Sequence, residues 1–223
     1  MKKVIAIVLA VVLVAMLGAT GVFAQENPNA SAKATAQIAE LEVVSASATE
    51  GDEVDWHSSD VVEILTQTIK TANDKDLFID VSLLSGLYTE TNVKSHGNKD
   101  TSGAAGAVLV AVFVDGDMAF PGYPIVFEGR VQVLTATLGG YFVDDVLTPE
   151  EIGLIIGTLS ANSFNFIAQD LDSGMHEVVV KAACVTGAFS QEGSAAAVAA
   201  IGLGSVTIEE VRMVKGEDAV PEF

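Results

Sequence analysis

Residues 163–214 alternate between apolar and other side chains, and this pattern limits the fold more than any other part of the chain. In the middle of this stretch, every second residue belongs to one face, which carries His176, Val178, Val180, Ala182 and Cys184. Successive side chains of a strand point to opposite faces, so this period predicts a strand with one buried face. Turn-forming residues at 172–174 and 191–193 separate it from its neighbours. The stretch therefore predicts consecutive antiparallel strands of a large sandwich.

Other segments show the same alternation. The clearest is residues 77–88, where Ile79 and Val81 face one side, and Asp80 and Ser82 face the other. Such a pattern predicts a strand with one face in the core. Further strands are expected at residues 34–48, 62–72, 108–114, 125–138 and 204–213.

Several local signals refine this assignment. Residues 108–114 are apolar on both faces, which predicts a central strand covered on both sides. Asp115-Gly116 after it is a strong hairpin signal. Bulges are expected at Gly129-Arg130 and at residues 209–210, where the alternation changes phase. Residues 91–106 are rich in Asn, Lys, Ser, Thr and Gly, and predict either a long, mobile loop or a strand end with a loop attached.

One segment reads as a helix. Thr148 and Pro149, followed by two acidic residues, stand in the order that a helix start favours. The apolar residues after them keep a spacing of three and four: Ile152, Ile155, Ile156 and Leu159. Gly153 and Gly157 each weaken a helix by about 1 kcal/mol relative to alanine, so packing must hold it. We expect one short helix that caps an end of the sandwich.

These patterns predict an all-β fold: an antiparallel β-sandwich of jelly-roll type with one short helix. We expect the sandwich domain at residues 34–214, after a flexible leader at 25–33. A C-terminal tail follows at 215–223.

The first 24 residues predict a signal peptide. Lys2 and Lys3 precede an apolar run at residues 4–17, and Ala24 stands at a suitable cleavage position. The alternative is a membrane anchor, but a spanning helix needs about 20 apolar residues. We therefore expect a protein secreted to the extracellular space or the cell surface of a prokaryote, with no membrane attachment after cleavage.

The chain is strongly acidic. It has 11 basic and 30 acidic residues and a net charge of −19, which becomes −21 when Lys2 and Lys3 leave with the signal peptide. An acidic surface repels phosphate backbones and anionic lipid headgroups, so neither nucleic acid nor a membrane surface is expected as a partner. The acidic surface is compatible with divalent cations or with solubility alone.

Cys184 is the one cysteine, so an internal disulfide is excluded and the core must supply the stability. Its position on the apolar face of a strand predicts a buried, unreactive thiol. Pairing between chains through Cys184 would require that it be exposed.

The segment around Trp56, the only tryptophan, is the first candidate binding site. Trp56 would stack on a sugar ring, and Asp55, His57 and Asp60 would supply hydrogen bonds. The alternative, which we favour, places Trp56 in the core or at a strand entrance. Sugar-binding faces usually present several exposed aromatic residues, and this chain has one Trp and three Tyr.

Acidic loops are the second candidate. Asp115, Asp117, Asp170 and Asp172 flank two predicted turns. Calcium takes six to eight oxygen ligands from converging loops, so these residues form a candidate calcium site. Turns also select Asp for backbone reasons alone, and we favour this explanation. No other cofactor is expected.

Two further features carry alternatives. His176 follows a turn, where we expect it to bond to the turn backbone rather than to a metal. The strand at 34–48 either pairs within its own sheet, as we favour, or inserts into a neighbouring subunit and builds a filament.

Two stretches resemble known groups. Residues 68–72 with 76–79, and residues 204–212, resemble secreted prokaryotic β-sandwich proteins to which no activity is assigned. Residues 164–174 with 176–180 look like the closing hairpin of jelly-roll domains in phage tail-fibre tips. The second resemblance implies a sandwich fold, and it points weakly to oligomers or ligand binding.

We expect a secreted, non-enzymatic extracellular module with a structural or adhesive role, which forms a homo-oligomer or filament. The alternative is a module that binds carbohydrate or calcium. A hydrolase with scattered acidic catalysts ranks third, because the sequence contains no recognisable catalytic motif.

Overall fold

The computed structural model describes residues 32–37, 42–48, 52–72 and 75–213. Nearly all of them lie in strands. In chain order the strands are β1 (Ala32–Gln37), β2 (Glu42–Ala48), β3 (Asp52–Ser58), β4 (Val62–Thr71), β5 (Lys75–Ser95), β6 (Lys99–Val114), β7 (Asp117–Met118), β8 (Ile125–Thr137), β9 (Tyr141–Val143), β10 (Val146–Thr148), β11 (Glu150–Leu171), β12 (Gly174–Ser190) and β13 (Ser194–Val211).

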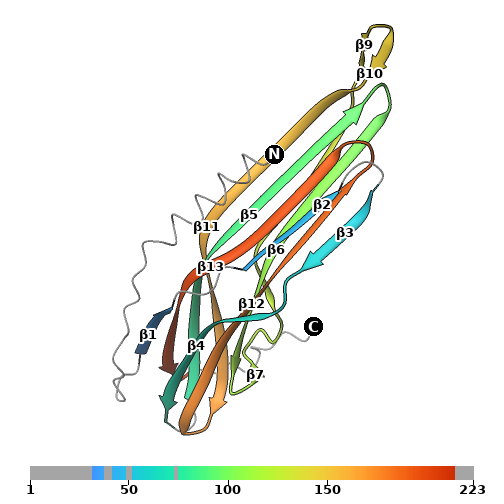
Figure 1. Ribbon diagram of the computed structural model, residues 1–223. Coiled ribbons are helices and arrows are strands. Elements are labelled where there is room, and N and C mark those ends of the chain that lie inside the picture. Colours follow the sequence, from blue (N-terminus) through green and yellow to red (C-terminus); the bar gives the residue numbers. More distant parts are fainter. Residues whose placement is uncertain (1–31, 38–41, 49–51, 73–74, 214–223) are drawn as a thin grey trace.

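The strands form two antiparallel sheets and a separate hairpin. In sheet A, β13 pairs with β5 on one side and with β1 and β2 on the other, and β11 forms the edge beyond β5. In sheet B, β12 pairs with β6, β3 and β4 lie along the far side of β12, and β7 and β8 lie along β6. Figure 1 shows an elongated body whose upper end carries the β9–β10 hairpin. The chain is all-β, and its two sheets stack as in a sandwich.

The two long central strands follow the period predicted from the sequence. Ile79 and Val81 on β5 are fully buried, as are Val180 and Cys184 on β12. The residues that alternate with these buried positions along β5 and β12 lie on the outer faces of the sheets and are partly exposed. Each buried aliphatic side chain contributes about 1.5–3 kcal/mol, so these two rows supply much of the stability.

The space between the sheets divides into two regions of different chemistry. Toward the lower end, large apolar side chains fill an apolar core, whose fully buried members include Leu65, Ile69, Leu77, Leu83, Phe166 and Ile208. Toward the upper end, small and polar residues fill a polar core that includes Thr89, Thr91, Ser102, Gln132, Thr186, Ser190, Ala104, Ala188, Ala195 and Ala197. The upper half therefore relies on hydrogen bonds as well as on apolar burial.

Gln132 on β8 connects three strands in the polar core. Its side-chain nitrogen donates to the Thr91 hydroxyl and to the Leu154 carbonyl, each at 2.8 Å. The Thr89 hydroxyl donates to its side-chain oxygen, also at 2.8 Å. Gln132 thus joins the β8 edge of sheet B to β5 and β11 of sheet A.

Arg130, on the same face of β8, extends this connection. Its guanidinium donates to the Ile156 carbonyl at 2.9 Å and to the Thr158 hydroxyl at 2.8 Å. Further down β11, Ile167 forms a backbone bridge with Phe120. The edge strand of sheet A is therefore engaged at both ends, which limits pairing with a strand of another molecule.

The predicted helix is wrong. Residues 150–159 belong to β11, which pairs with β5 from Glu150 onward. Gly153 and Gly157 lower the helix propensity of this segment, and a long ladder to β5 outweighs the apolar spacing that indicated a helix. β-branched Ile152, Ile155 and Ile156 suit a strand equally well.

The long loop predicted at 91–106 is wrong, and the alternative of a strand end with a loop attached is closer to the structure. Residues up to Ser95 belong to β5, and β6 begins at Lys99, so the turn is short. Its Thr and Ser residues indicated a loop because such residues are usually exposed. Here Thr91, Ser95 and Ser102 point into the polar core, where hydrogen bonds satisfy them.

Smaller details differ as well. The single strand expected at 34–48 is divided into β1 and β2, with residues 38–41 outside the described part of the chain. The irregularity expected at 209–210 lies instead between Gly202 and Gly204. The one expected at Gly129-Arg130 lies just before them, between Val126 and Glu128.

Several predictions are confirmed. The strands at 62–72, 77–88 and 108–114 are present, and Cys184 is buried. Asp115 and Gly116 have φ angles of 52° and 92°, as a two-residue hairpin turn requires. The signal peptide and the C-terminal tail lie outside the described residues, and among those that are described no helix could cross a membrane.

Candidate functional site

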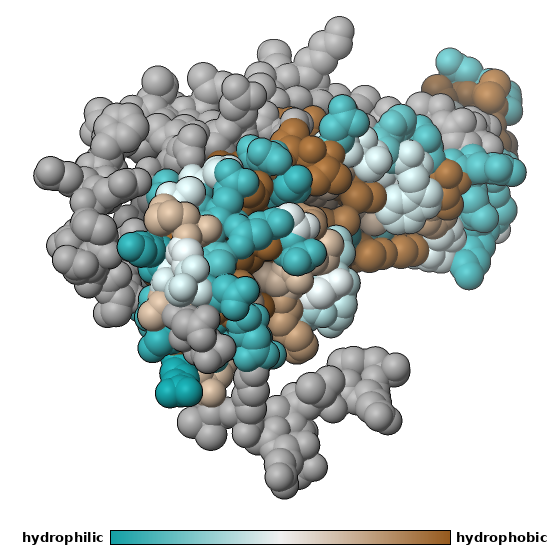
Figure 2. Space-filling model, turned by 90° about the horizontal axis from the view of Figure 1, so that it is seen from below, coloured by the Kyte–Doolittle hydropathy of each residue, from teal (hydrophilic) through white to brown (hydrophobic). Residues whose placement is uncertain are grey.

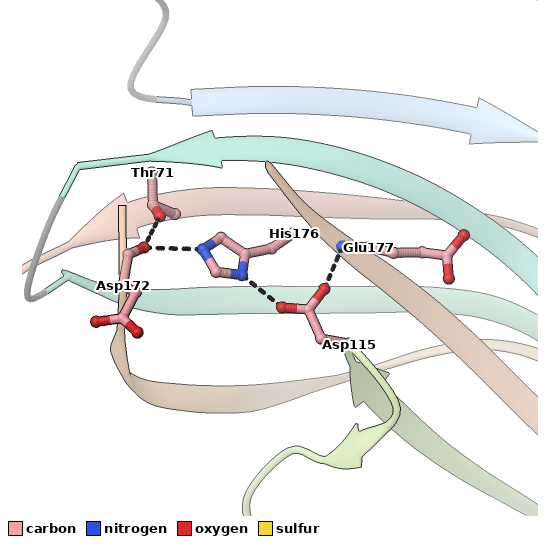
Figure 3. Close-up of polar contacts among 5 residues, drawn as sticks. All are labelled: Thr71, Asp115, Asp172, His176 and Glu177. Carbon is pink, nitrogen blue, oxygen red and sulfur yellow. Dashed lines mark hydrogen bonds and ion pairs between the residues drawn. The ribbon is translucent and has the colours of Figure 1, made fainter. Parts of the chain in front are cut away.

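Three elements meet around His176 at the lower end of the molecule (Figure 3). Nδ1 of His176 lies 2.6 Å from Oδ2 of Asp115, which belongs to the turn after β6. Nε2 lies 2.9 Å from the backbone carbonyl oxygen of Asp172, in the turn before β12. A carboxylate and a carbonyl both accept hydrogen bonds, so the ring satisfies both only when it is protonated on both nitrogens.

The same contacts hold Asp115 in place. The Glu177 amide donates to its Oδ1 at 2.8 Å, and the Asp115 amide donates to the Glu177 carbonyl at 2.9 Å. The Thr71 hydroxyl donates to the Asp172 carbonyl at 2.8 Å. The cluster therefore ties β4 and two turns to the start of β12.

The two ionisable groups favour each other's charged forms. Burial lowers the pKa of His176, but its hydrogen bonds to Asp115 and Asp172 and the nearby negative charges outweigh burial and raise the pKa above its usual value. Burial also raises the pKa of Asp115, but hydrogen bonds from His176 and the Glu177 amide outweigh it and lower the pKa. The pair is a charged clamp between elements.

The four aspartates predicted to bind calcium do not share one arrangement. Asp115 is engaged by His176, and Figure 3 shows the Asp172 carboxylate pointing away from that ring. Asp117 is exposed on β7, and the Asp170 amide donates to the Asp76 carboxylate at 3.0 Å. Within the described ranges, no three His, Cys, Asp or Glu side chains are grouped so that they could hold a metal ion. The predicted backbone contact of His176 is confirmed, whereas no sequence pattern indicates that Asp115 is its partner.

The residues predicted to bind sugar separate onto two faces of β3. Trp56 pairs with Gly187, whereas His57 and Asp55 pair with the adjacent residues of β12 and so point to the opposite face. His57 lies 2.7 Å from the Asp55 carboxylate, and both are exposed. Asp60 is exposed beyond the end of the strand. Trp56 therefore does not share a face with these polar residues.

Trp56 is not in the core, contrary to the interpretation we favoured. It is 62 % exposed and lies on the outer face of sheet B. Its ring covers Gly187 so closely that a Cβ added there would stand 2.7 Å from the indole. An exposed aromatic ring on a glycine of the neighbouring strand is a flat, accessible contact surface.

Trp56 forms one wall of a groove of about 410 Å³. The groove is lined by Trp56, Val185, Ala105, Gly106, Ala107, Val126, Gly129, Arg130 and Val131. Arg130 is the only lining residue with a charged side chain, and its guanidinium bonds to β11. A sugar would therefore find few hydroxyl partners here, and an apolar occupant suits the groove better.

The groove belongs to a larger surface that we call the outer B face. Each of the four strands contributes one residue to a row in register across it: Trp56, Gly187, Ala105 and Val131. The other outward residues of this part of the sheet are Val54, Ser58, Val185, Phe189, Gly103, Ala107, Val126, Gly129 and Val133. None of these positions is charged, in a chain of net charge −19.

The sequence held a partial signal for this surface. Residues 108–114 were predicted to be covered on both sides because both faces are apolar. Val108 and Val110 are buried in the apolar core, as expected. Leu109 and Phe113 lie on the outer side of sheet B and are partly exposed. Viewed from below, Figure 2 shows hydrophobic patches on the surface among hydrophilic residues.

Comparison with known proteins identifies no family. No protein-family model matches the chain, and no curated protein matches it. Among solved structures there is a weak likeness to an infectious bursal disease virus Gx strain structure, with 10 % identity, a TM-score of 0.16, and coverage of 85 % of this chain and 44 % of that one. The VP2 subviral particle of the same virus gives 10 % identity, a TM-score of 0.13, and coverage of 85 % and 46 %. The chain spans less than half of these proteins, and scores this low do not establish a shared fold.

Proposed function

We propose that the protein is a non-enzymatic module of the prokaryotic cell surface or extracellular space, with a structural or adhesive role. The observation that supports this most is the outer B face, an uncharged surface with an exposed tryptophan on an acidic protein. Monomeric proteins rarely expose wide apolar patches, and such patches commonly mark contact sites. The export signal proposed for residues 1–24 supports the location.

The jelly-roll arrangement is part of this proposal. Support comes from the order of the strands of ten or more residues: β4 lies in sheet B, β5 in sheet A, β6 and β8 in sheet B, β11 in sheet A, β12 in sheet B and β13 in sheet A. Consecutive strands that cross between two sheets are typical of Greek-key sandwiches. The long strands also make the body elongated, which suits a spacer or surface module (Figure 1).

Cell fractionation tests the proposed function. The full chain is expressed in a prokaryotic host, and its amount is measured in the cytoplasm, on the cell surface, in sedimenting extracellular material and in the clear medium. We expect retention on the surface or in sedimenting material, and release into the medium by Val131→Asp, which places a charge on the outer B face.

Val146→Asp is the matched control, because Val146 is also well exposed but lies on the β9–β10 hairpin. This variant should be retained like the wild type. Cytoplasmic protein, or turnover of a substrate that is lost on changing one Asp or Glu, would contradict the proposal.

Carbohydrate binding is the second candidate, favoured by the exposure of the Trp56 indole. Saturable binding in a glycan screen, lost in the Trp56→Ala variant, would support carbohydrate binding.

Calcium binding by the turns around Asp115 and Asp172 is tested by titration calorimetry. At this site calcium would have to compete with His176 for the Asp115 carboxylate, because the imidazole ring already forms an ion pair with it.

A further inference from the structure

We propose that the outer B face is the contact surface between two copies of this chain, packed face to face with Trp56 of each copy in the groove of the other. This inference rests on the proposed function and names its partner. It concerns a symmetric pair, in which the same surface is used by both molecules.

The shape of the face suits a second copy. Its floor consists of small residues, including Gly187, Ala105 and Ala107, and it is bordered by Trp56 on one side and Val131 on the other. Two such faces related by a two-fold axis place the projecting ring of each over the small residues of the other. Aromatic side chains seated in small pockets contribute much of the energy of protein interfaces.

The charge distribution points to the same partner. Two molecules that each carry a net charge of −19 repel each other wherever acidic surfaces meet. The outer B face lacks charged side chains at all of its named positions, and Lys181, the next outward residue of β12 below Ala183, is engaged with Glu63 at 3.1 Å. Arg130 is the one charged residue that lines the groove, and its guanidinium already donates to the Ile156 carbonyl and the Thr158 hydroxyl. Copies of the chain can therefore approach closely on this face without bringing acidic surfaces together. A basic partner would be drawn to the acidic surfaces instead.

The size of the face is sufficient for a reversible contact. The outward positions span five residues on each of β3, β12 and β6 and eight on β8. With strands about 4.8 Å apart and about 3.4 Å per residue, the face covers about 375 Å². Two such faces bury about 750 Å², which is below the size of a stable interface and suits a weak, transient contact. We therefore expect a dimer that dissociates on dilution.

Trp56 is the only tryptophan, so its fluorescence reports on this interface directly. The experiment measures the emission maximum of the purified protein and its mass by sedimentation over a dilution series. We expect the dimer fraction to fall on dilution while the emission shifts to longer wavelength over the same concentration range, as the indole becomes hydrated.

Two variants locate the contact. Val131→Asp should raise the dissociation constant at least about tenfold, because it buries a charge in the interface. Gly187→Ala keeps the fluorophore, but its Cβ displaces the indole that now covers Gly187, so it should also weaken the dimer. Val146→Asp, on the β9–β10 hairpin, should leave the dissociation constant unchanged.

Three outcomes would overturn the inference. The first is a monomer at every concentration with hydrated Trp56. The second is a monomer whose shielded Trp56 does not respond to dilution, which would mean that another part of the chain covers the face. The third is a dimer that Val131→Asp leaves intact. If surface retention in cells still depends on Val131 in these cases, the proposed function stands with a different partner.

Discussion

Nδ1 of His176 and Oδ2 of Asp115 lie 2.6 Å apart, although 61 positions separate the two residues in the chain. The contact joins the start of β12 to the turn that follows β6. Because the ring also bonds to the Asp172 carbonyl, His176 contributes fully to the fold only in its protonated form.

Stability should therefore depend on pH through this pair. The pKa of His176 is raised in the folded state, so its contribution is complete below its unfolded pKa of about 6.5 and is lost as pH rises through the folded value. The pKa of Asp115 is lowered, so its contribution is present above about pH 4 and is lost as pH falls through the folded value. The pair contributes most between these limits.

Calorimetric Tm values from about pH 5 to pH 9 check this prediction. The wild type should lose more Tm above about pH 6.5 than Asp115→Asn, in which the ion pair is absent. His57→Gln is the control, because the exposed pair of His57 and Asp55 should leave the profile unchanged. Equal pH profiles for wild type and Asp115→Asn would show that the cluster does not act as an ion pair.

Asp100→Asn should destabilise the upper end of the molecule. The carboxylate is fully buried and accepts hydrogen bonds from the Lys94, Thr101 and Glu192 amides at 2.6, 2.7 and 3.0 Å. In the Asp100→Asn variant, the side-chain NH₂ group would face at least one of these backbone N–H groups, and two donors cannot form a hydrogen bond. We therefore expect a loss of about 2–4 kcal/mol in the free energy of unfolding. Urea denaturation measures it, and exposed Asp117→Asn should change stability by less than about 0.5 kcal/mol.

Val81→Asp should abolish folding. Val81 is fully buried between the sheets, where a carboxylate finds no partner and cannot be hydrated. Circular dichroism and resistance to protease measure the loss, and Ile79→Asp should behave in the same way. Val131→Asp, on the outer face, should remain folded. A folded Val81→Asp protein would contradict the strand phase.

Cys184→Ala should leave the oligomeric state unchanged. The thiol is fully buried on the inner face of β12 and cannot reach another molecule without unfolding. We expect a loss of about 1 kcal/mol from the smaller side chain. Light scattering under oxidising and reducing conditions checks the first point, and the disappearance of a dimer in the variant would show that the cysteine is accessible.

The regular part of the fold could be predicted from the sequence because one buried face leaves a period of two. Ile79 and Val81 show this on β5, and Val178 and Val180 show it on β12. The period of two in apolar residues does not identify a strand where the buried side chains are polar. Thr91 and Ser102 look like loop residues, and only partners on other strands explain why they can be buried. Gln132 on β8 bonds to Thr91, whereas Ser102 bonds to the Asn92 carbonyl on β5 and to Ser190 on β12.

β11 shows a second limit of sequence patterns. Ile152, Ile155, Ile156 and Leu159 fit a helical stripe, yet they lie on an exposed edge strand, where neither face is fully covered and a period of two does not develop. The candidate site was predicted only in part for a related reason. Trp56 could be identified as a candidate, but Gly187, Ala105 and Val131 become its neighbours only through strand pairing.

The long ladders of sheet A have a mechanical consequence. β5 is paired along most of its length with β11 on one side and with β13 on the other. A pulling force along the strands loads these hydrogen bonds together in shear, whereas a force across them would open the ladder one pair at a time. A molecule anchored at one end and held at the other would therefore resist stretching along the long axis in Figure 1.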